Sequence, residues 1–61
     1  MTLQELYESK FPAVKFISIS QNHEATSPDF ADEYLETHGG YEVTNYEYYE
    51  KYDVLLVELK Q

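Results

Sequence analysis

Residues 54–60 read VLLVELK, the most continuously apolar segment of this 61-residue chain. A strand with neighbours on both edges and a covered face has this pattern, so we expect the segment at the centre of a β-sheet. The four residues before it, EKYD at 50–53, are polar enough to form a turn, although they lack the Asn-Gly or Gly of a tight hairpin. Residues 41–49, YEVTNYEYY, are rich in strand formers and predict an antiparallel partner for the apolar strand.

The segment upstream of this hairpin, SPDFADEYLETHGG at 27–40, predicts an amphipathic helix. Ser27 is a favourable N-cap and Pro28 a favourable first helical residue. Gly39-Gly40 would end the helix, at a position where a left-handed residue is needed. Helical spacing gathers apolar and acidic side chains on opposite faces. The apolar set is Phe30, Ala31, Tyr34 and Leu35, and the acidic set is Asp29, Asp32, Glu33 and Glu36.

The N-terminal part of the chain predicts a further helix and a further strand. Thr2 and Glu5 have the spacing of a capping box, and Pro12 ends the helical pattern, which together predict a helix over 3–10. Residues 13–20, AVKFISIS, carry the β-branched and aromatic side chains typical of a strand, and the polar residues 21–26 predict a loop.

These elements predict a small single α+β domain over residues 1–61, with the element order α-β-α-β-β. We expect a three-stranded mixed sheet in the spatial order 1-3-2, because the most apolar strand should be central, with the helices packed on one face. The link of about twenty residues between the first two strands holds a helix, so those strands can run parallel. The other face of the sheet is either exposed or an interface.

The charge balance excludes several classes of function. Twelve Asp and Glu against four Lys and no Arg give a net charge of −8, which argues against direct binding to nucleic acid and against docking on an anionic membrane. The absence of Cys excludes disulfides and Cys-based zinc sites. An apolar content of 43%, with seven Tyr and three Phe, argues for a folded chain. No signal peptide or membrane-spanning run is recognisable, so we expect a cytoplasmic location, in the host cytoplasm if the chain is viral.

Two groups of residues are candidates for binding a partner. The acidic helix face has no Lys or Arg on the same helix to neutralise it, although a solvated surface is the alternative interpretation. The tyrosine-rich stretch 41–53 combines exposed rings with carboxylates, which suits a basic groove on a protein, although the rings could instead cover a small core. Strand alternation places Glu42, Thr44, Tyr46 and Tyr48 on one face of this stretch, and Tyr41, Val43, Asn45, Glu47 and Tyr49 on the other. The expected partner-binding residues are Asp29, Asp32, Glu33, Glu36, Glu42, Tyr46, Glu47, Tyr48 and Glu50.

No motif in the sequence indicates an enzyme, a metal site or a cofactor. The serines lie in no G-x-S-x-G context, and Gly39-Gly40 follows a helix rather than preceding one. His23 and His38 are fifteen residues apart, a spacing that matches no metal-binding motif. We therefore expect no catalytic residue, no metal ligand and no cofactor.

In size, acidity and tyrosine content, the chain resembles the small acidic inhibitors that many phages and mobile elements encode. Several of those proteins are similar to DNA in charge and occupy the nucleic-acid groove of a host enzyme. The resemblance implies an inhibitor that occludes a basic, nucleic-acid-binding surface of a partner protein. The alternative is a small structural module that forms a homodimer or larger assembly through Val54, Leu56 and the tyrosines, with the acidic residues serving only solubility.

Overall fold

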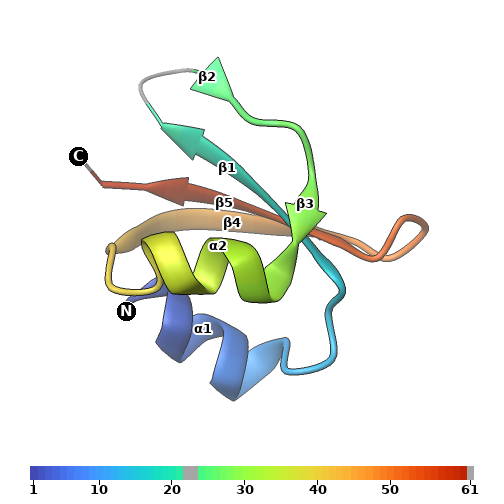
Figure 1. Ribbon diagram of the computed structural model, residues 1–61, viewed down its shortest axis with the longest axis horizontal. Coiled ribbons are helices and arrows are strands. Elements are labelled where there is room, and N and C mark those ends of the chain that lie inside the picture. Colours follow the sequence, from blue (N-terminus) through green and yellow to red (C-terminus); the bar gives the residue numbers. More distant parts are fainter. Residues whose placement is uncertain (22–23, 61) are drawn as a thin grey trace.

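The computed structural model describes residues 1–21 and 24–60, and it has two helices beside a mixed five-stranded sheet (Figure 1). The chain is therefore a small α+β fold. The elements in chain order are α1 (Leu3–Lys10), β1 (Phe16–Gln21), β2 (Glu24–Ala25), β3 (Asp29–Phe30), α2 (Ala31–His38), β4 (Val43–Tyr49) and β5 (Val54–Leu59).

The sheet has the order β2-β1-β5-β4, and β3 also pairs with β1. The most apolar strand, β5, lies between β1 and β4, as its composition predicts. The prediction of three strands is wrong, because Glu24–Ala25 and Asp29–Phe30 each pair antiparallel with β1. The predicted loop over 21–26 is thus replaced at 24–25 by a strand, while residues 22 and 23 lie outside the described part of the chain.

The strand directions also differ from the prediction. β1 runs parallel to β5, and β4 runs antiparallel to β5, so β1 and β4 are antiparallel to each other. The reason is visible in Figure 1, where the segment from β2 to β3 returns along β1 before α2 begins. The returning segment runs opposite to β1, and α2 reverses the direction a second time. The turn after α2 reverses it a third time, so β4 runs antiparallel to β1.

Helix α1 begins as its sequence predicts. The Thr2 hydroxyl accepts a hydrogen bond from the Glu5 backbone amide at 3.2 Å, and the Glu5 carboxylate accepts one from the Thr2 amide at 2.9 Å. This reciprocal capping box satisfies two amides that the first turn of a helix leaves without partners. The helix ends at Lys10, just before the Pro12 that was expected to end it.

Helix α2 begins at Ala31 rather than near Pro28, so the predicted helix start is wrong. Phe30 occupies the N-cap position with extended backbone angles and no side-chain cap. Its ring stacks on Phe16 with the centroids 5.5 Å apart, and the Ala31 amide donates to the Lys15 carbonyl at 2.9 Å. These contacts with β1 hold 29–30 as a strand, against the local preference of Ser27 and Pro28 for a helix start.

The C-terminal end of α2 requires glycine for its close contacts rather than for a left-handed backbone. Gly39 is the C-cap with φ −56°, so the predicted left-handed residue is wrong. A Cβ atom at Gly39 would collide with the Leu35 carbonyl oxygen and would lie 3.1 Å from the Gln4 side chain. The Gly39 carbonyl also accepts a hydrogen bond of 2.9 Å from the Gln4 amide, which ties the end of α2 to the start of α1.

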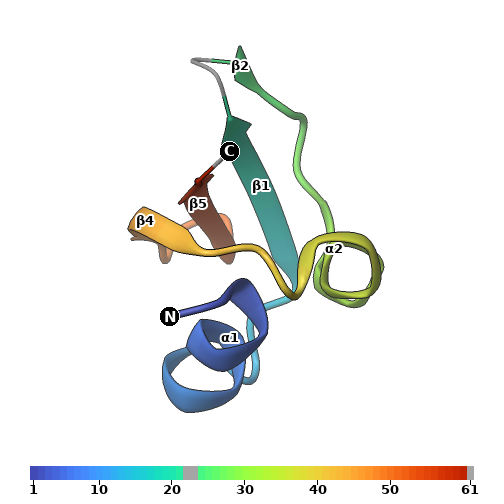
Figure 2. The same ribbon diagram turned by 90° about the vertical axis from the view of Figure 1, so that its left-hand side faces the viewer.

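Both helices cover the same face of the sheet, and the core lies between them and the strands (Figure 2). Leu3 and Leu6 of α1 are completely buried there. Every second residue of β1 and β5 points into this core, which is the alternation of a sheet covered on one face. The buried apolar residues are Leu3, Leu6, Val14, Ile17, Ile19, Ala31, Leu55, Val57 and Leu59.

A β-bulge at Thr44 changes which side chains of β4 face the helices. Val43 pairs with Leu59 and Asn45 pairs with Glu58, so β4 holds one extra residue between the two pairs. A bulge of this kind shifts the alternation by one residue. The predicted division of 41–49 into odd and even faces is therefore wrong across the bulge, because Val43 and Tyr46 lie on the same, helix-covered face.

Candidate protein-binding surface

The structure divides the predicted acidic helix face. Asp32, Glu33 and Glu36 are exposed on α2, and we call these three residues the acidic stripe. Asp29 is not part of it, because this residue belongs to β3, where it pairs with Ile17. One oxygen of its carboxylate accepts a hydrogen bond of 2.8 Å from the Phe30 amide. The stripe is thus shorter than predicted and spans little more than one turn of helix.

Two of the predicted partner-binding tyrosines, Tyr46 and Tyr48, pack on the helix-covered side of β4. Their rings lie 5.7 Å and 5.4 Å from the Phe11 ring, centroid to centroid. Lys10 donates a hydrogen bond of 3.0 Å to the Tyr46 hydroxyl. The two side chains remain exposed at one edge, with 39% and 38% of their surface accessible. Both rings therefore pack on Phe11, which itself packs against the core, and both keep an accessible edge.

Glu42 pairs with the Met1 amino group at 2.8 Å and lies outside strand β4. This contact also raises the pKa of the Met1 amine above its ordinary value, because the hydrogen bond and the nearby negative charge favour the protonated form. Of the predicted site residues, Glu42 is the one with a cationic partner in the described part of the chain.

The predicted residues consequently do not form one surface. The acidic stripe lies on α2 beside β1, whereas Tyr46, Glu47 and Tyr48 belong to β4, and α2 and β4 stand at opposite sides of the view in Figure 2. Glu47 points to the uncovered face of the sheet, since it pairs with Leu56. Glu50 lies beyond β4, in the turn before β5. The negative charge surrounds the fold instead of being concentrated in one patch.

The uncovered face of the sheet, which we call the open face, carries three rows of side chains that run across the strands. The first, the apolar row, consists of Phe30, Phe16, Val54 and Tyr49. The second, the mixed row, consists of Ser18, Leu56 and Glu47, of which Ser18 is buried and donates a hydrogen bond of 2.6 Å to the Thr26 carbonyl. The third, the polar row, consists of Ala25, Ser20, Glu58 and Asn45. The open face thus changes from apolar to acidic along the strand direction.

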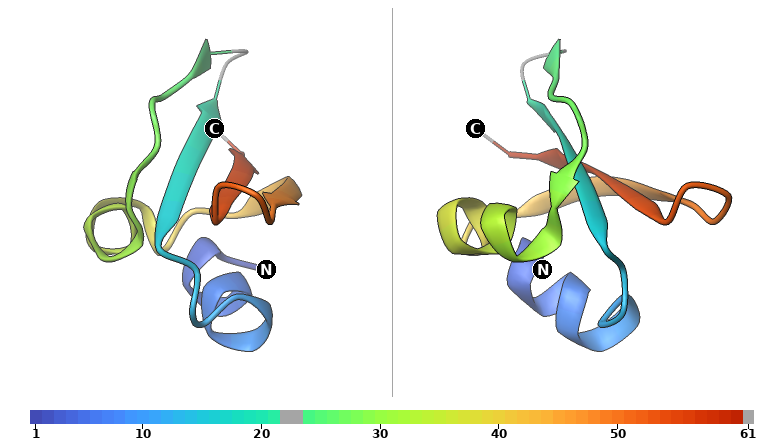
Figure 3. Two further views of the ribbon diagram at one scale, coloured as in Figure 1. Left: turned by 90° about the vertical axis from the view of Figure 1, so that its right-hand side faces the viewer. Right: turned by 45° about the vertical axis from the view of Figure 1, so that its right-hand side comes forward.

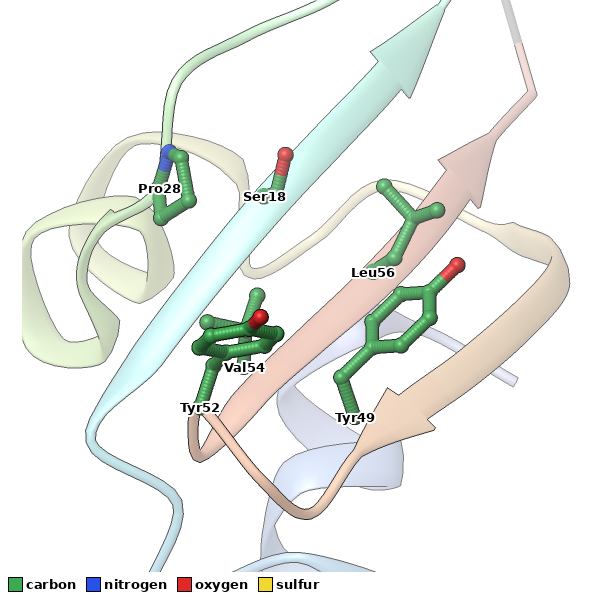
Figure 4. Close-up of a pocket in the computed structure, with 6 residues that line it drawn as sticks. All are labelled: Ser18, Pro28, Tyr49, Tyr52, Val54 and Leu56. Carbon is green, nitrogen blue, oxygen red and sulfur yellow. The ribbon is translucent and has the colours of Figure 1, made fainter.

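An open groove of about 430 Å³ lies over the apolar and mixed rows (Figure 4). It is lined by Ser18, Pro28, Tyr49, Tyr52, Val54 and Leu56. Tyr52 comes from the turn between β4 and β5 (Figure 3) and is 65% exposed, while Phe30 at the end of the apolar row is 57% exposed. Large apolar side chains that remain exposed together on one face are typical of a surface that binds another molecule.

A second hollow of about 210 Å³ adjoins the groove at Leu56 and is lined by Asn45, Tyr46, Glu47, Leu56 and Glu58. Glu47 and Glu58 lie diagonally across neighbouring strands on this face. The Tyr49 hydroxyl donates a hydrogen bond of 3.0 Å to Glu47, which orients that carboxylate along the open face. The same carboxylate raises the pKa of Tyr49, because it stabilises the protonated phenol and repels the phenolate.

The lysines leave the carboxylates of the chain without cationic partners. In residues 1–21 and 24–60, which include all twelve acids and all four lysines, the one ion pair is that between Met1 and Glu42. Lys10 and Lys51 instead lie over tyrosine rings, 5.5 Å and 5.6 Å from the ring centroids. In these residues, the other eleven Asp and Glu side chains form no ion pair.

The aromatic part of the open face is not predicted by the sequence patterns. Phe16 was expected in a strand, and Phe30 was expected on the core side of a helix. Pro28 was expected inside the same helix. Their convergence depends on the short β3 strand, for which the local sequence gives no signal. A signal does exist for Val54 and Leu56, since they alternate with the buried Leu55 and Val57 in an apolar run, which predicts apolar residues on both faces.

Neither helix in the described part of the chain has the length and apolar character to span a bilayer. In the same residues, no group of three or more His, Asp or Glu side chains is arranged to hold a metal ion. His23, one of the two histidines considered as metal ligands, lies outside the described residues, and the ring of His38 accepts or donates a 2.7 Å hydrogen bond with Thr37.

No protein-family model, curated protein or solved structure matches this chain. The functional assignment therefore depends on its own residues and their arrangement.

Proposed function

We propose that this chain is an acidic protein-binding inhibitor that occludes a basic, nucleic-acid-binding surface of a partner protein. The observation that carries the proposal is the set of carboxylates that none of the four lysines neutralises. Net charge far from zero accelerates association with an oppositely charged surface, and a protein surface that binds nucleic acid is rich in Lys and Arg. The carboxylates would occupy the positions that backbone phosphates otherwise take.

The arrangement of the charge favours a protein partner over a small cation. The acidic stripe lies on α2, Glu47 and Glu58 lie on the sheet, and Glu50 lies in the turn, so the charge as a whole does not converge on one point. A rigid fold that presents carboxylates on several sides can fill a groove and meet its two walls at once. The exposed rings of Tyr49 and Tyr52 add contact area to this surface, and their faces can accept cationic side chains.

Affinity capture tests this proposal when elution is by competition with DNA. The immobilised chain is exposed to a nuclease-treated cell lysate at low salt, and bound proteins are eluted with duplex DNA or with an uncharged polymer. We expect DNA to release basic nucleic-acid-binding proteins that the polymer leaves bound. Each released protein is then purified, and its mobility shift with labelled DNA is titrated with this chain. Proteins whose DNA complexes persist at saturating chain would contradict the proposal.

The self-associating module remains a second candidate, because the open face carries an exposed apolar row. Sedimentation velocity across a wide concentration range separates the two. A monomer at all concentrations favours the inhibitor, whereas a concentration-dependent dimer that Leu56→Ser disrupts favours self-association.

A further inference from the structure

We propose that the open face binds an extended basic segment of the partner protein, with an apolar side chain in the groove and an Arg or Lys side chain against Glu47 and Glu58. This proposal rests on the proposed function, whose partner is a basic protein, and it adds the site and the register of the contact. We infer the chemistry of the bound segment from the order of the apolar, mixed and polar rows along the open face.

The groove supplies the apolar half of the site. Val54 and Leu56 form its floor on β5, and Tyr49 and Tyr52 stand beside them (Figure 4). Both helices lie on the opposite face of the sheet, so in the described residues no element covers these side chains. Aliphatic or aromatic side chains of a partner would displace water from this surface, which is the main favourable contribution to association.

The adjoining hollow supplies the charged half. Glu47 and Glu58 line it together, and it meets the groove at Leu56. The three rows of the open face contain no lysine, and Lys51 of the turn lies over the Tyr52 ring, 5.6 Å from its centroid. A guanidinium or ammonium group is the complement of two neighbouring carboxylates, and a planar guanidinium can also stack on a tyrosine ring.

Charge complementarity selects this occupant over a second copy of the chain. A second copy would bring its own net charge of −8 and a further Glu47 and Glu58 to a surface that is already acidic. Like charges across an interface oppose association, whereas a basic segment would neutralise the two carboxylates. The apolar row alone would suit either occupant, so the carboxylates decide between them.

The strand geometry gives the register of the bound segment. Leu56 and Glu58 are two residues apart on β5, which corresponds to about 6.6 Å along the strand. An extended segment has the same repeat, so an apolar residue over Leu56 places the residue two positions further along over the carboxylates. The expected pattern is therefore an apolar residue followed, at every second position, by Arg or Lys.

A synthetic peptide tests this pattern without knowledge of the natural partner. The probe is a capped nine-residue peptide with Phe, Leu, Arg and Arg at alternate positions and Ser or Gly between them. Two control peptides replace either Phe and Leu by Ser or both Arg by Glu. Binding to the isotope-labelled chain is followed by amide chemical shifts. We expect shifts confined to β5, the end of β4 and the turn, at least tenfold weaker binding of the first control, and no binding of the second.

Variants of the chain localise the contact. Glu58→Gln and Glu47→Gln should each weaken binding of the probe peptide several-fold, and Val54→Thr, which preserves shape and strand preference, should weaken it as well. Glu8→Gln removes the same charge from α1, on the helix-covered side, and should leave the dissociation constant unchanged. Equal effects of Glu8→Gln and Glu58→Gln would overturn the proposal, because binding would then follow net charge alone. Shifts centred on α2, or a homodimer that masks the open face, would also overturn it.

The two proposals fail in different ways. If the probe peptide binds the open face but the chain never competes with DNA for any captured protein, the site stands and the inhibitory function is wrong. If the chain does compete with DNA, and Val54→Thr and Glu58→Gln compete as well as the unaltered chain, the function stands and the site is wrong.

Discussion

Leu56 of β5 lies directly opposite Glu47 of β4 on the open face, so an aliphatic side chain and a carboxylate are immediate neighbours across two strands. The same strand directs Leu55 and Val57 into the core. One strand therefore stabilises the fold with one set of side chains and presents the other set to solvent. This division makes it possible to alter the open face and the core separately.

The first prediction compares neighbouring residues of β5. Leu55→Ala should lower the free energy of unfolding by about 2–5 kcal/mol, because it leaves a cavity in a closely packed core. A domain of this size has a total stability of about 3–5 kcal/mol, so this variant should be largely unfolded. Leu56→Ser should remain folded, as judged by far-ultraviolet circular dichroism and urea unfolding. Similar losses in both variants would mean that the open face is covered in solution.

The second prediction concerns the capping box of α1. Thr2→Ala removes the hydroxyl that accepts a hydrogen bond from the Glu5 amide, and it should reduce the free energy of unfolding by about 1 kcal/mol. Thr37→Ala is the matched control, since its hydroxyl bonds only exposed groups within α2. In urea unfolding, Thr37→Ala should leave the free energy of unfolding almost unchanged. A neutral Thr2→Ala would show that the cap contributes nothing to stability.

The third prediction follows from the pKa of Glu5. Hydrogen bonds from the Thr2 backbone amide and from the Thr2 side chain lower the pKa of Glu5 below its ordinary value of 4.5, and the positively charged N-terminus lowers it further. A carboxyl group with a lowered folded-state pKa contributes stability that is present above pH 4.5 and is lost as the pH falls through the folded-state pKa. Glu5→Gln should therefore flatten the acid limb of the stability–pH curve. Parallel curves for the unaltered chain and Glu5→Gln would contradict this assignment.

The fourth prediction concerns Tyr48 at the end of β4. Its hydroxyl donates a hydrogen bond of 2.9 Å to Asp53, which raises the pKa of the phenol above its ordinary value of 10. This bond contributes stability below pH 10 that is lost as the pH rises through the folded-state pKa. Asp53→Asn should lower the pKa of Tyr48, because it removes the charge. Asn also tolerates the positive φ of 52° at this position.

NMR titration of the tyrosine ring carbons measures that change for each residue. Glu47→Gln is the matched control, since Glu47 accepts from Tyr49 instead. It should lower the pKa of Tyr49 and leave that of Tyr48 unchanged. If both variants shift both tyrosines equally, the shifts reflect the overall charge of the chain and not the two hydrogen bonds.

The sequence is sufficient to predict the elements whose signals are local. The capping box of Thr2 and Glu5 depends on residues three apart, and the central place of β5 follows from its apolar run. The start of α2 was wrong because Ser27 and Pro28 carry a local helix signal that pairing of Asp29 with Ile17 overrides. Such pairing joins residues twelve positions apart, so the capping signal at 27–28 does not reveal it.

The sequence predicts that the candidate site is acidic, but it does not predict how the residues of the site are arranged. The excess of carboxylates is a property of composition, and the structure adds that the lysines do not neutralise it. The bulge at Thr44 could not be foreseen, because the one-residue shift depends on the register between β4 and β5. That shift places Val43 on the same face as Tyr46, which packs on Phe11. Alternation within 45–49 is unchanged, so Glu47 lies on the open face, opposite to Tyr46.

We propose that carboxylates left without cationic partners bind a basic protein at the surface where it binds nucleic acid. The most direct measurement is the dissociation constant between this chain and a purified protein that DNA elutes from it, at low and high salt, with and without saturating duplex DNA. We expect the affinity to fall steeply as salt rises, because exposed charges are screened, and we expect DNA to exclude the chain. An affinity that is the same at both salt concentrations, or a stable complex of all three molecules, would contradict the account.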